Sequence, residues 1–158
     1  MGPWRLRYAS DAAEGMWAHI TLIYPFRDSA RLDAETIQGI ENVVFFFESF
    51  PFSLARVEYF RSPRVVLYLA PEPAAPFRAL TGAFEETFPD APSYGGMFEE
   101  VIPHVQIADE DDSALLGTIE SDIGPRLPIE ATARKVELVE HTSQGWSRRQ
   151  VFTLPGSA

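Results

Sequence analysis

The sequence predicts an α+β fold of two related β-α-β-β halves, with antiparallel-rich sheets around a central cleft and helices on the outside. Three observations predict this fold. Strand-like and helix-like segments occur in the same order twice along the 158 residues. The second strand of each half carries an arginine followed shortly by Val-Glu, at 56–58 and 134–137. The third strands end alike, in Leu-Ala-Pro at 69–71 and in Leu-Pro at 154–155.

The first half spans about residues 14–71. Its expected elements are a strand, a helix and two further strands, at 16–24, 33–47, 52–60 and 64–70. The first strand is rich in β-branched and aromatic residues and ends before Pro25. Asp33 suits a helix N-cap, apolar residues follow at helical spacing, and Pro51 ends the pattern. The phenylalanine run at 45–47 is expected in the core.

A helix at 77–88 and a loop at 89–100 link this half to the second, which spans about residues 101–155. The expected elements of the second half are a strand, a helix and two strands, at 101–108, 109–123, 129–141 and 146–154. The acidic residues 109–112 are expected at the helix N-terminus, because carboxylates there suit the positive end of the helix dipole. All 158 residues are expected to form one domain.

Composition limits the possible functions. The formal net charge is −10, which argues against a protein that grips long nucleic acid mainly through its phosphates. A small nucleotide, or one RNA end in a local cleft, remains compatible with this charge. There is no cysteine, so disulfides, thiolate metal sites and a cysteine nucleophile are excluded.

Short apolar runs, such as 43–47, predict no membrane span, since a bilayer requires about 20 apolar residues. The N-terminal residues have no apolar stretch typical of a secretory signal. We therefore expect a cytoplasmic monomer without an obligate protein partner.

Two histidines occupy matching places in the two halves, at His19 and His104. Because side chains alternate along a strand, His19 and Thr21 share one face of the first strand. His104 and Gln106 share one face of the corresponding strand in the second half. A pseudo-two-fold relation between the halves would bring both polar faces to one cleft.

Facing imidazoles suit phosphoryl transfer, because one neutral ring can accept a proton while a protonated ring donates one. A hydroxyl or amide two residues further along can donate to a phosphate oxygen as charge develops. No glycine-rich nucleotide loop and no zincin motif is present, and the acidic cluster at 109–112 lacks the spacing of a calcium loop.

Two His-x-Thr-like motifs in duplicated β-α-β-β halves resemble the 2H phosphoesterase superfamily, and most closely its bacterial 2′-5′ RNA ligase/RNA 2′,3′-cyclic phosphodiesterase branch. Residues 19–26, His-Ile-Thr-Leu-Ile-Tyr-Pro-Phe, are similar to the first motif of that branch. Tyr-Gly-Gly at 94–96 and Pro-His-Val-Gln-Ile-Ala at 103–108 are similar to the approach to its second motif. The resemblance extends from about residue 7 to residue 154.

The resemblance implies a bilobal fold and a reaction without metal or other cofactor, with His19 and His104 as catalytic acid and base. Thr21 would bind phosphate through its hydroxyl, with Gln106 in the corresponding position of the second motif. The implied substrate is a 2′,3′-cyclic phosphate, or a related 2′-5′ phosphodiester, on an RNA end or a small nucleotide. RNA ligation is the possible reverse reaction.

Two residues depart from the family pattern. Gln106 stands where the family has a second hydroxyl, and Asp109 stands where many members have an arginine. The alternative function is therefore a non-catalytic module that binds a nucleotide or RNA end and has lost turnover through Gln106. A third interpretation is a structural protein whose paired histidines are coincidental.

Other residues have simpler expected roles. His141 is expected on the surface. Arg5 and Arg7 could reach an anionic ligand, although a frayed basic terminus is the favoured interpretation. Trp146, Arg148 and Arg149 could stack a base and contact phosphate, although a solvated hairpin is the favoured interpretation.

Overall fold

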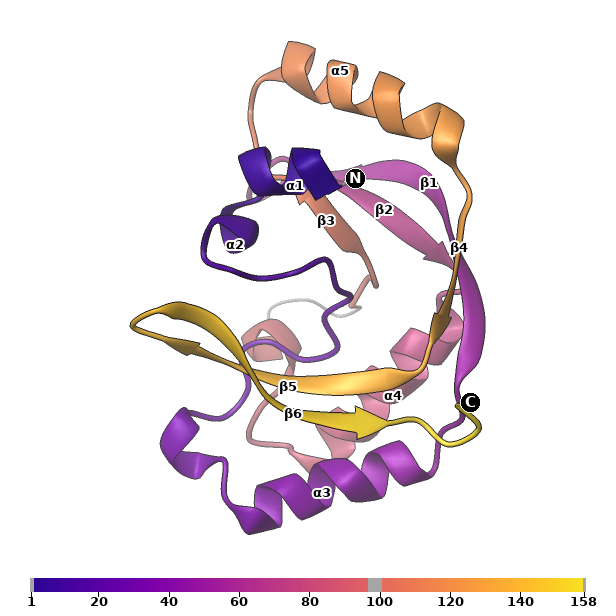
Figure 1. The fold of residues 1–158 in the computed structure, drawn as a ribbon. Helices are drawn as coiled ribbons and strands as arrows, with labels where there is room; N and C mark the ends of the chain where they lie inside the picture. Colours follow the sequence, from indigo (N-terminus) through magenta and orange to yellow (C-terminus); the bar gives the residue numbers. More distant parts are fainter. Residues whose placement is uncertain (1, 97–100, 158) are drawn as a thin grey trace.

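The computed structural model describes residues 2–96 and 101–157 and shows an α+β fold with a curled antiparallel sheet (Figure 1). Its α-helices are α1 (Gly2–Tyr8), α2 (Ser10–Ala13), α3 (Ala34–Phe45), α4 (Ala75–Thr87) and α5 (Ser113–Ile123). Its strands are β1 (Phe50–Phe60), β2 (Val66–Glu72), β3 (Val105–Ala108), β4 (Ile129–Ala133), β5 (Lys135–Thr142) and β6 (Gly145–Thr153). Short 3₁₀ turns are η1 (Ser29–Arg31), η2 (Ser93–Gly96) and η3 (Gly124–Arg126). The expected fold class is confirmed.

The strand pairing reflects the sequence repeat. One sheet has the order β3-β2-β1-β4, and β5 and β6 form a separate hairpin. The first part of β1 pairs antiparallel with β4, with Phe50 opposite Ala133 and Leu54 opposite Ile129. Further along, β1 pairs with β2, whereas the chain beyond β4 continues into β5 and pairs with β6. Two equivalent strands thus pair with each other first, and each then pairs with the next strand of its own half, as a pseudo-two-fold axis requires.

The core consists of two hydrophobic clusters, and each combines both halves of the sequence. One cluster joins α3 and α4 to the β5–β6 hairpin, and its most buried side chain is Leu154. The other joins β1, β2 and β3 to α5, with Leu67, Ile107 and Ile119 fully buried. Figure 1 shows α5 and α3 at opposite ends of the molecule. The lobe limits expected from the sequence, about 14–71 and 101–155, therefore do not coincide with these two packed units.

The expected strand at 16–24 is wrong, because this segment is irregular and forms no ladder. Side chains bind the carbonyls that a neighbouring strand would use. The guanidinium of Arg5 donates to the carbonyls of residues 16 and 17. The hydroxyls of Thr81 and Ser93 both donate to the carbonyl of Leu22, at 3.0 and 3.1 Å.

Two other strand boundaries differ from expectation. The strand expected at 101–108 begins only at Val105, so His104 lies directly before β3. The strand expected at 129–141 is divided at Arg134, where the chain leaves the large sheet and enters the hairpin. The loop expected at 89–100 includes residues 97–100, which lie outside the described residues.

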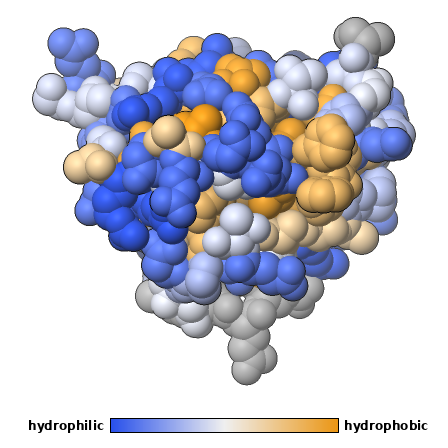
Figure 2. Space-filling view, turned by 90° about the horizontal axis from the view of Figure 1, so that it is seen from below, coloured by the Kyte–Doolittle hydropathy of each residue, from blue (hydrophilic) through white to orange (hydrophobic). Residues whose placement is uncertain are grey.

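The three predicted helices are present, but α5 begins at Ser113 instead of residue 109, and one expectation about the core is wrong. The amide of Thr36 donates to the side chain of Asp33, which confirms the N-cap of α3. Asp112 caps α5 in the same way. Phe45 and Phe46 are 72% and 82% exposed instead of buried, because the inward face of α3 carries residues such as Val44. Figure 2, which views the molecule from below, shows apolar side chains grouped on an otherwise largely hydrophilic surface.

Candidate functional site

One large cleft collects the residues that the sequence predicted to act together. Its volume is about 970 Å³, near the upper end of the roughly 300–1,000 Å³ typical of ligand sites. It lies between the large sheet, the segment 16–24 and the β5–β6 hairpin. His19, Thr21, His104 and Gln106 all line it.

The two histidines make the same backbone contact. Nδ1 of His19 lies 2.7 Å from the carbonyl oxygen of Trp17, and Nδ1 of His104 lies 2.8 Å from that of Ile102. In each case the partner is two residues earlier in the chain. Because a carbonyl oxygen only accepts hydrogen bonds, Nδ1 carries the proton in both rings. Nε2 of each neutral ring is therefore left with a lone pair.

His104 lies in a more apolar environment than an exposed histidine. Its ring contacts Phe60 edge-on, with centroids 5.0 Å apart, and lies 5.5 Å from the ring of Tyr68. Burial is the main cause that lowers the pKa of His104 below 6.5, and electrostatic interaction with the His19 imidazole acts in the same direction. The carbonyl of Ile102 and the carboxylate of Asp11 act in the opposite direction but do not reverse the shift.

We expect an NMR titration to give His104 a pKa below 6.5. Asp11→Asn should lower it further, because the carboxylate stabilises the protonated ring. Glu41→Gln, on the exposed surface of α3, should leave it unchanged. An unchanged or raised pKa of His104 in Asp11→Asn would contradict this assignment.

The lowered pKa of His104 also has a consequence for stability. The His104 imidazole binds a proton more readily in the unfolded chain than in the folded protein. The free energy of unfolding therefore falls as the pH drops from about 6.5 to the lower pKa that His104 has in the folded protein. In His104→Gln, stability should depend less on pH in that range.

The burial pattern of β3 confirms the expected alternation. Val105 and Ile107 are buried, whereas His104 and Gln106 are partly exposed and line the cleft. Gln106 lies opposite Tyr68 in the pairing of β2 with β3. Strand pairing therefore fixes the backbone of Gln106, whereas Thr21 lies on the irregular segment 16–24, which has no such pairing.

Asp11 lines the cleft and was not singled out from the sequence, and the buried Arg5 contacts it from outside the cleft lining. Arg5 is 3% exposed, so the expectation of a frayed terminus is wrong for this residue. Its guanidinium pairs with Asp11 at 3.2 Å, and Oδ2 of Asp11 lies 3.9 Å from Nδ1 of His19. Arg7, in contrast, is exposed. Neither Arg5 nor Asp11 belongs to a motif or to a periodic pattern that could have indicated its role.

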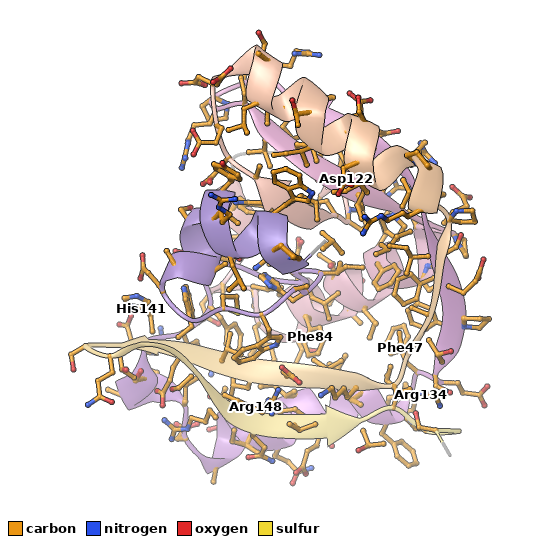
Figure 3. All side chains as sticks on the ribbon, turned by 45° about the horizontal axis from the view of Figure 1, so that its top comes forward. Phe47, Phe84, Asp122, Arg134, His141 and Arg148 are labelled. Atoms are coloured by element: carbon orange, nitrogen blue, oxygen red, sulfur yellow. The ribbon has the colours of Figure 1, made fainter. Side chains whose placement is uncertain are left out.

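The β5–β6 hairpin forms a wall of the cleft through Trp146 and Arg148, so it is more than a solvated surface. The guanidinium of Arg148 lies over the ring of Trp17, 4.9 Å from its centroid, and contacts Glu137 at 3.1 Å. Figure 3 shows Arg148 on this hairpin, His141 near its tip and Arg134 where β4 passes into β5. His141 is exposed, as expected.

Asp109 is held by partners of its own. The backbone amide of Ser10 donates to its carboxylate at 3.0 Å, the Ser10 hydroxyl donates to it as well, and Arg64 pairs with it at 2.9 Å. Asp109 does not cap α5, since that position belongs to Asp112. Its negative charge on the cleft is partly neutralised by Arg64.

The cleft differs in charge from the whole chain. Its described lining has four basic and three acidic side chains, Arg64, Arg134, Lys135, Arg148, Asp11, Asp109 and Glu137. In a chain of net charge −10 this is a locally favourable place for an anion. Among the described residues, no group of three His, Asp or Glu side chains is placed to hold a metal ion. The described helices include none long and apolar enough to cross a membrane.

This curled antiparallel fold, with a histidine motif from each half on one cleft, is that of the 2H phosphoesterases. A model of the 2′-5′ RNA ligase superfamily matches residues 1–145, and the chain belongs to that superfamily. The crystal structure of TT0787 from Thermus thermophilus has a similar fold, with a TM-score of 0.61 and 18% sequence identity. That similarity covers 89% of this chain and 80% of the other. A comparison with proteins of curated function gave no match.

Proposed function

We propose that this protein hydrolyses a 2′,3′-cyclic phosphate, on an RNA end or a small nucleotide, by acid–base catalysis with His19 and His104. The observation that carries the proposal is the matched orientation of the two imidazoles. Both line one cleft, and in both a backbone carbonyl holds Nδ1 and leaves Nε2 available for proton transfer.

In the proposed reaction one histidine removes a proton from water as the water oxygen forms a bond to phosphorus. The bond from phosphorus to one ribose oxygen breaks, and the other histidine donates a proton to that oxygen. The product is a ribose with one free hydroxyl and a phosphomonoester. Each proton transfer contributes typically about 10²–10⁴-fold in rate.

The surroundings of the two rings favour distinct roles. His104 has a lowered pKa and is therefore mostly neutral at pH 7, as a general base requires. His19 is the second histidine of the cleft, with the Asp11 carboxylate 3.9 Å from its Nδ1, and takes the complementary role of general acid. We assign His104 as base and His19 as acid in the hydrolytic direction.

The remaining polar groups of the cleft suit a phosphorylated nucleoside. Thr21 and Gln106 offer a hydroxyl and an amide as donors to non-bridging phosphate oxygens. The indole rings of Trp17 and Trp146 and the guanidinium of Arg148 offer stacking surfaces for a base. With four basic and three acidic side chains in its described lining, the cleft suits a single phosphate group on a nucleotide or RNA end better than a long nucleic acid.

The test is hydrolysis of a substrate panel by the purified protein. The panel contains the four 2′,3′-cyclic mononucleotides, an oligoribonucleotide with a 2′,3′-cyclic phosphate end and a 2′-5′-linked dinucleotide. Phosphomonoester formation, unchanged by EDTA, is expected with at least one of the cyclic phosphates. Absence of turnover on the whole panel, together with measurable binding, would favour the non-catalytic binding module. Ligation is assayed separately, with a cyclic-phosphate end and a 5′-hydroxyl end.

Gln106→Thr distinguishes a catalytic site in which glutamine contributes to the reaction from a binding site in which glutamine has replaced the catalytic hydroxyl. We expect the substitution to reduce cyclic phosphodiesterase activity by roughly tenfold, since the shorter hydroxyl no longer reaches the oxygen that the amide contacts. Initial rates under saturating and limiting substrate measure the effect. A large gain in rate would instead show that glutamine impairs the site. Gln150→Thr, on β6 outside the cleft lining, is the matched control.

A further inference from the structure

The guanidinium of Arg5 joins the two histidine segments, which lie far apart in the sequence. Arg5 belongs to α1 and is 3% exposed. Its Nη1 donates to the carbonyl of Gln106. Its Nη2 lies 3.2 Å from the carbonyl of Met16, 3.3 Å from that of Trp17 and 3.2 Å from Oδ2 of Asp11.

These acceptors are close to the reacting groups. The carbonyl of Trp17 is also the acceptor for Nδ1 of His19, so Arg5 and His19 share one oxygen. Gln106 is two residues beyond His104, on the strand that carries this histidine into the cleft. One planar group is therefore bound to the backbone of both motifs.

A buried guanidinium is unfavourable unless hydrogen bonds and a counter-charge compensate for its lost hydration. Here one carboxylate and three carbonyls provide that compensation. The segment 16–24 has no ladder to a neighbouring strand, so these bonds replace part of the support that a strand would give.

Resting on the proposed function, we propose that Arg5 is a positioning residue that sets the spacing and orientation of His19 relative to His104. The rigid fork of the guanidinium donates to Gln106 on one side and to Met16 and Trp17 on the other. A lysine in this position keeps the charge but not the fork, because its ammonium is a single point donor on a flexible stem.

The main test compares Arg5→Lys with wild type. We expect a folded variant whose kcat on 2′,3′-cyclic AMP falls about 10- to 100-fold while KM changes less than about threefold, because misplaced catalytic groups slow the chemical step. Arg7→Lys, two residues along the same helix and exposed, should keep wild-type kinetics.

An NMR measurement follows the same substitution without relying on activity. At pH 8, ¹⁵N spectra of wild type should show both His19 and His104 protonated on Nδ1. In Arg5→Lys the His19 signal should shift toward the Nε2-protonated form, since the carbonyl of Trp17 is no longer held in place. Wild-type kcat and wild-type imidazole signals in folded Arg5→Lys would overturn the proposal.

If Arg5→Lys does not fold, the double variant Arg5→Met with Asp11→Leu takes its place, because it removes both charges and retains similar volume. Since Asp11 itself lies beside His19, the losses are measured relative to Asp11→Asn. The same losses of kcat and of the His19 signal are then expected, and their absence overturns the proposal. A wild-type protein without activity would refute the proposed function alone, because the NMR comparison still decides the role of Arg5. An active wild type with unchanged variants would refute only the role of Arg5.

Discussion

Replacing either His19 or His104 by alanine is expected to reduce kcat/KM on a 2′,3′-cyclic nucleotide by about 10²–10⁴-fold. Each substitution removes one of the two groups that transfer protons in the same transition state. Because the groups act together, the double variant should lose much less than the product of the two single losses. Steady-state kinetics on the three variants measures both effects.

The pH dependence distinguishes the roles of the two histidines. Wild type should show a bell-shaped profile, with the acidic limb set by the base and the basic limb set by the acid. With His104 as base, the residual activity of His104→Ala should lack the acidic limb. His19→Ala should lack the basic limb. The lowered pKa of His104 places the acidic limb below pH 6.5.

His141 is the matched control, since it is the third histidine of the chain and lies outside the cleft lining. It is exposed and contacts Glu14. His141→Ala should therefore retain the wild-type kcat, and any change should be confined to KM, because the His141 ring contacts Trp146 of the cleft wall. Activity that survives the loss of both His19 and His104, or that EDTA abolishes, would refute the two-histidine mechanism.

Gly145→Ala is expected to destabilise the fold by at least about 2 kcal/mol, because a side chain there is unfavourable for two reasons. Gly145 has a φ of 102°, in the region that favours glycine. A Cβ atom would also lie 2.3 Å from the carbonyl oxygen of Glu14, and a backbone atom cannot move aside as a flexible side chain can. The amide of Trp146 donates to this carbonyl at 2.9 Å. The added methyl group would therefore disturb the hydrogen bond that joins the β5–β6 hairpin to the chain segment before His19.

Urea denaturation measures this effect. Gly117→Ala is the control, because Gly117 lies within α5 and a Cβ atom there meets nothing within 4 Å. That variant should be as stable as wild type or more stable by up to about 1 kcal/mol. Equal stability of Gly145→Ala and wild type would contradict the close approach of the hairpin to Glu14. At a temperature where Gly145→Ala stays folded, its activity should also fall, since the displaced contact precedes Trp17 and His19.

Local signals made most elements predictable. Asp33 and Pro51 bound a helix pattern whose capping bond the structure confirms. The shared sequence of the second strands predicted the repeat, and the mutual pairing of β1 with β4 agrees with it. The strand expected at 16–24 failed, because strand propensity is realised only where a neighbouring strand offers backbone partners. Here the side chains of Arg5, Thr81 and Ser93 took those partners instead.

The cleft was predictable only in part. His19, Thr21, His104 and Gln106 could be named because their spacing repeats along the chain, and all four line one cleft. Their catalytic and binding roles stay predictions. Trp146 and Arg148 were named as possible ligand contacts, but only the fold of the hairpin placed them in the cleft wall.

The sequence by itself determined the helices α3, α4 and α5, the Asp33 cap, the duplication and the pair of histidine motifs, since these depend on neighbouring residues and on periodicity. Only the tertiary structure decided that each packed unit combines both halves of the chain and that Arg5 connects the histidine segments. The physical reason is that a side chain bound to distant backbone carbonyls leaves no periodic trace in the sequence. Such contacts exist only once the two segments have been brought together by folding.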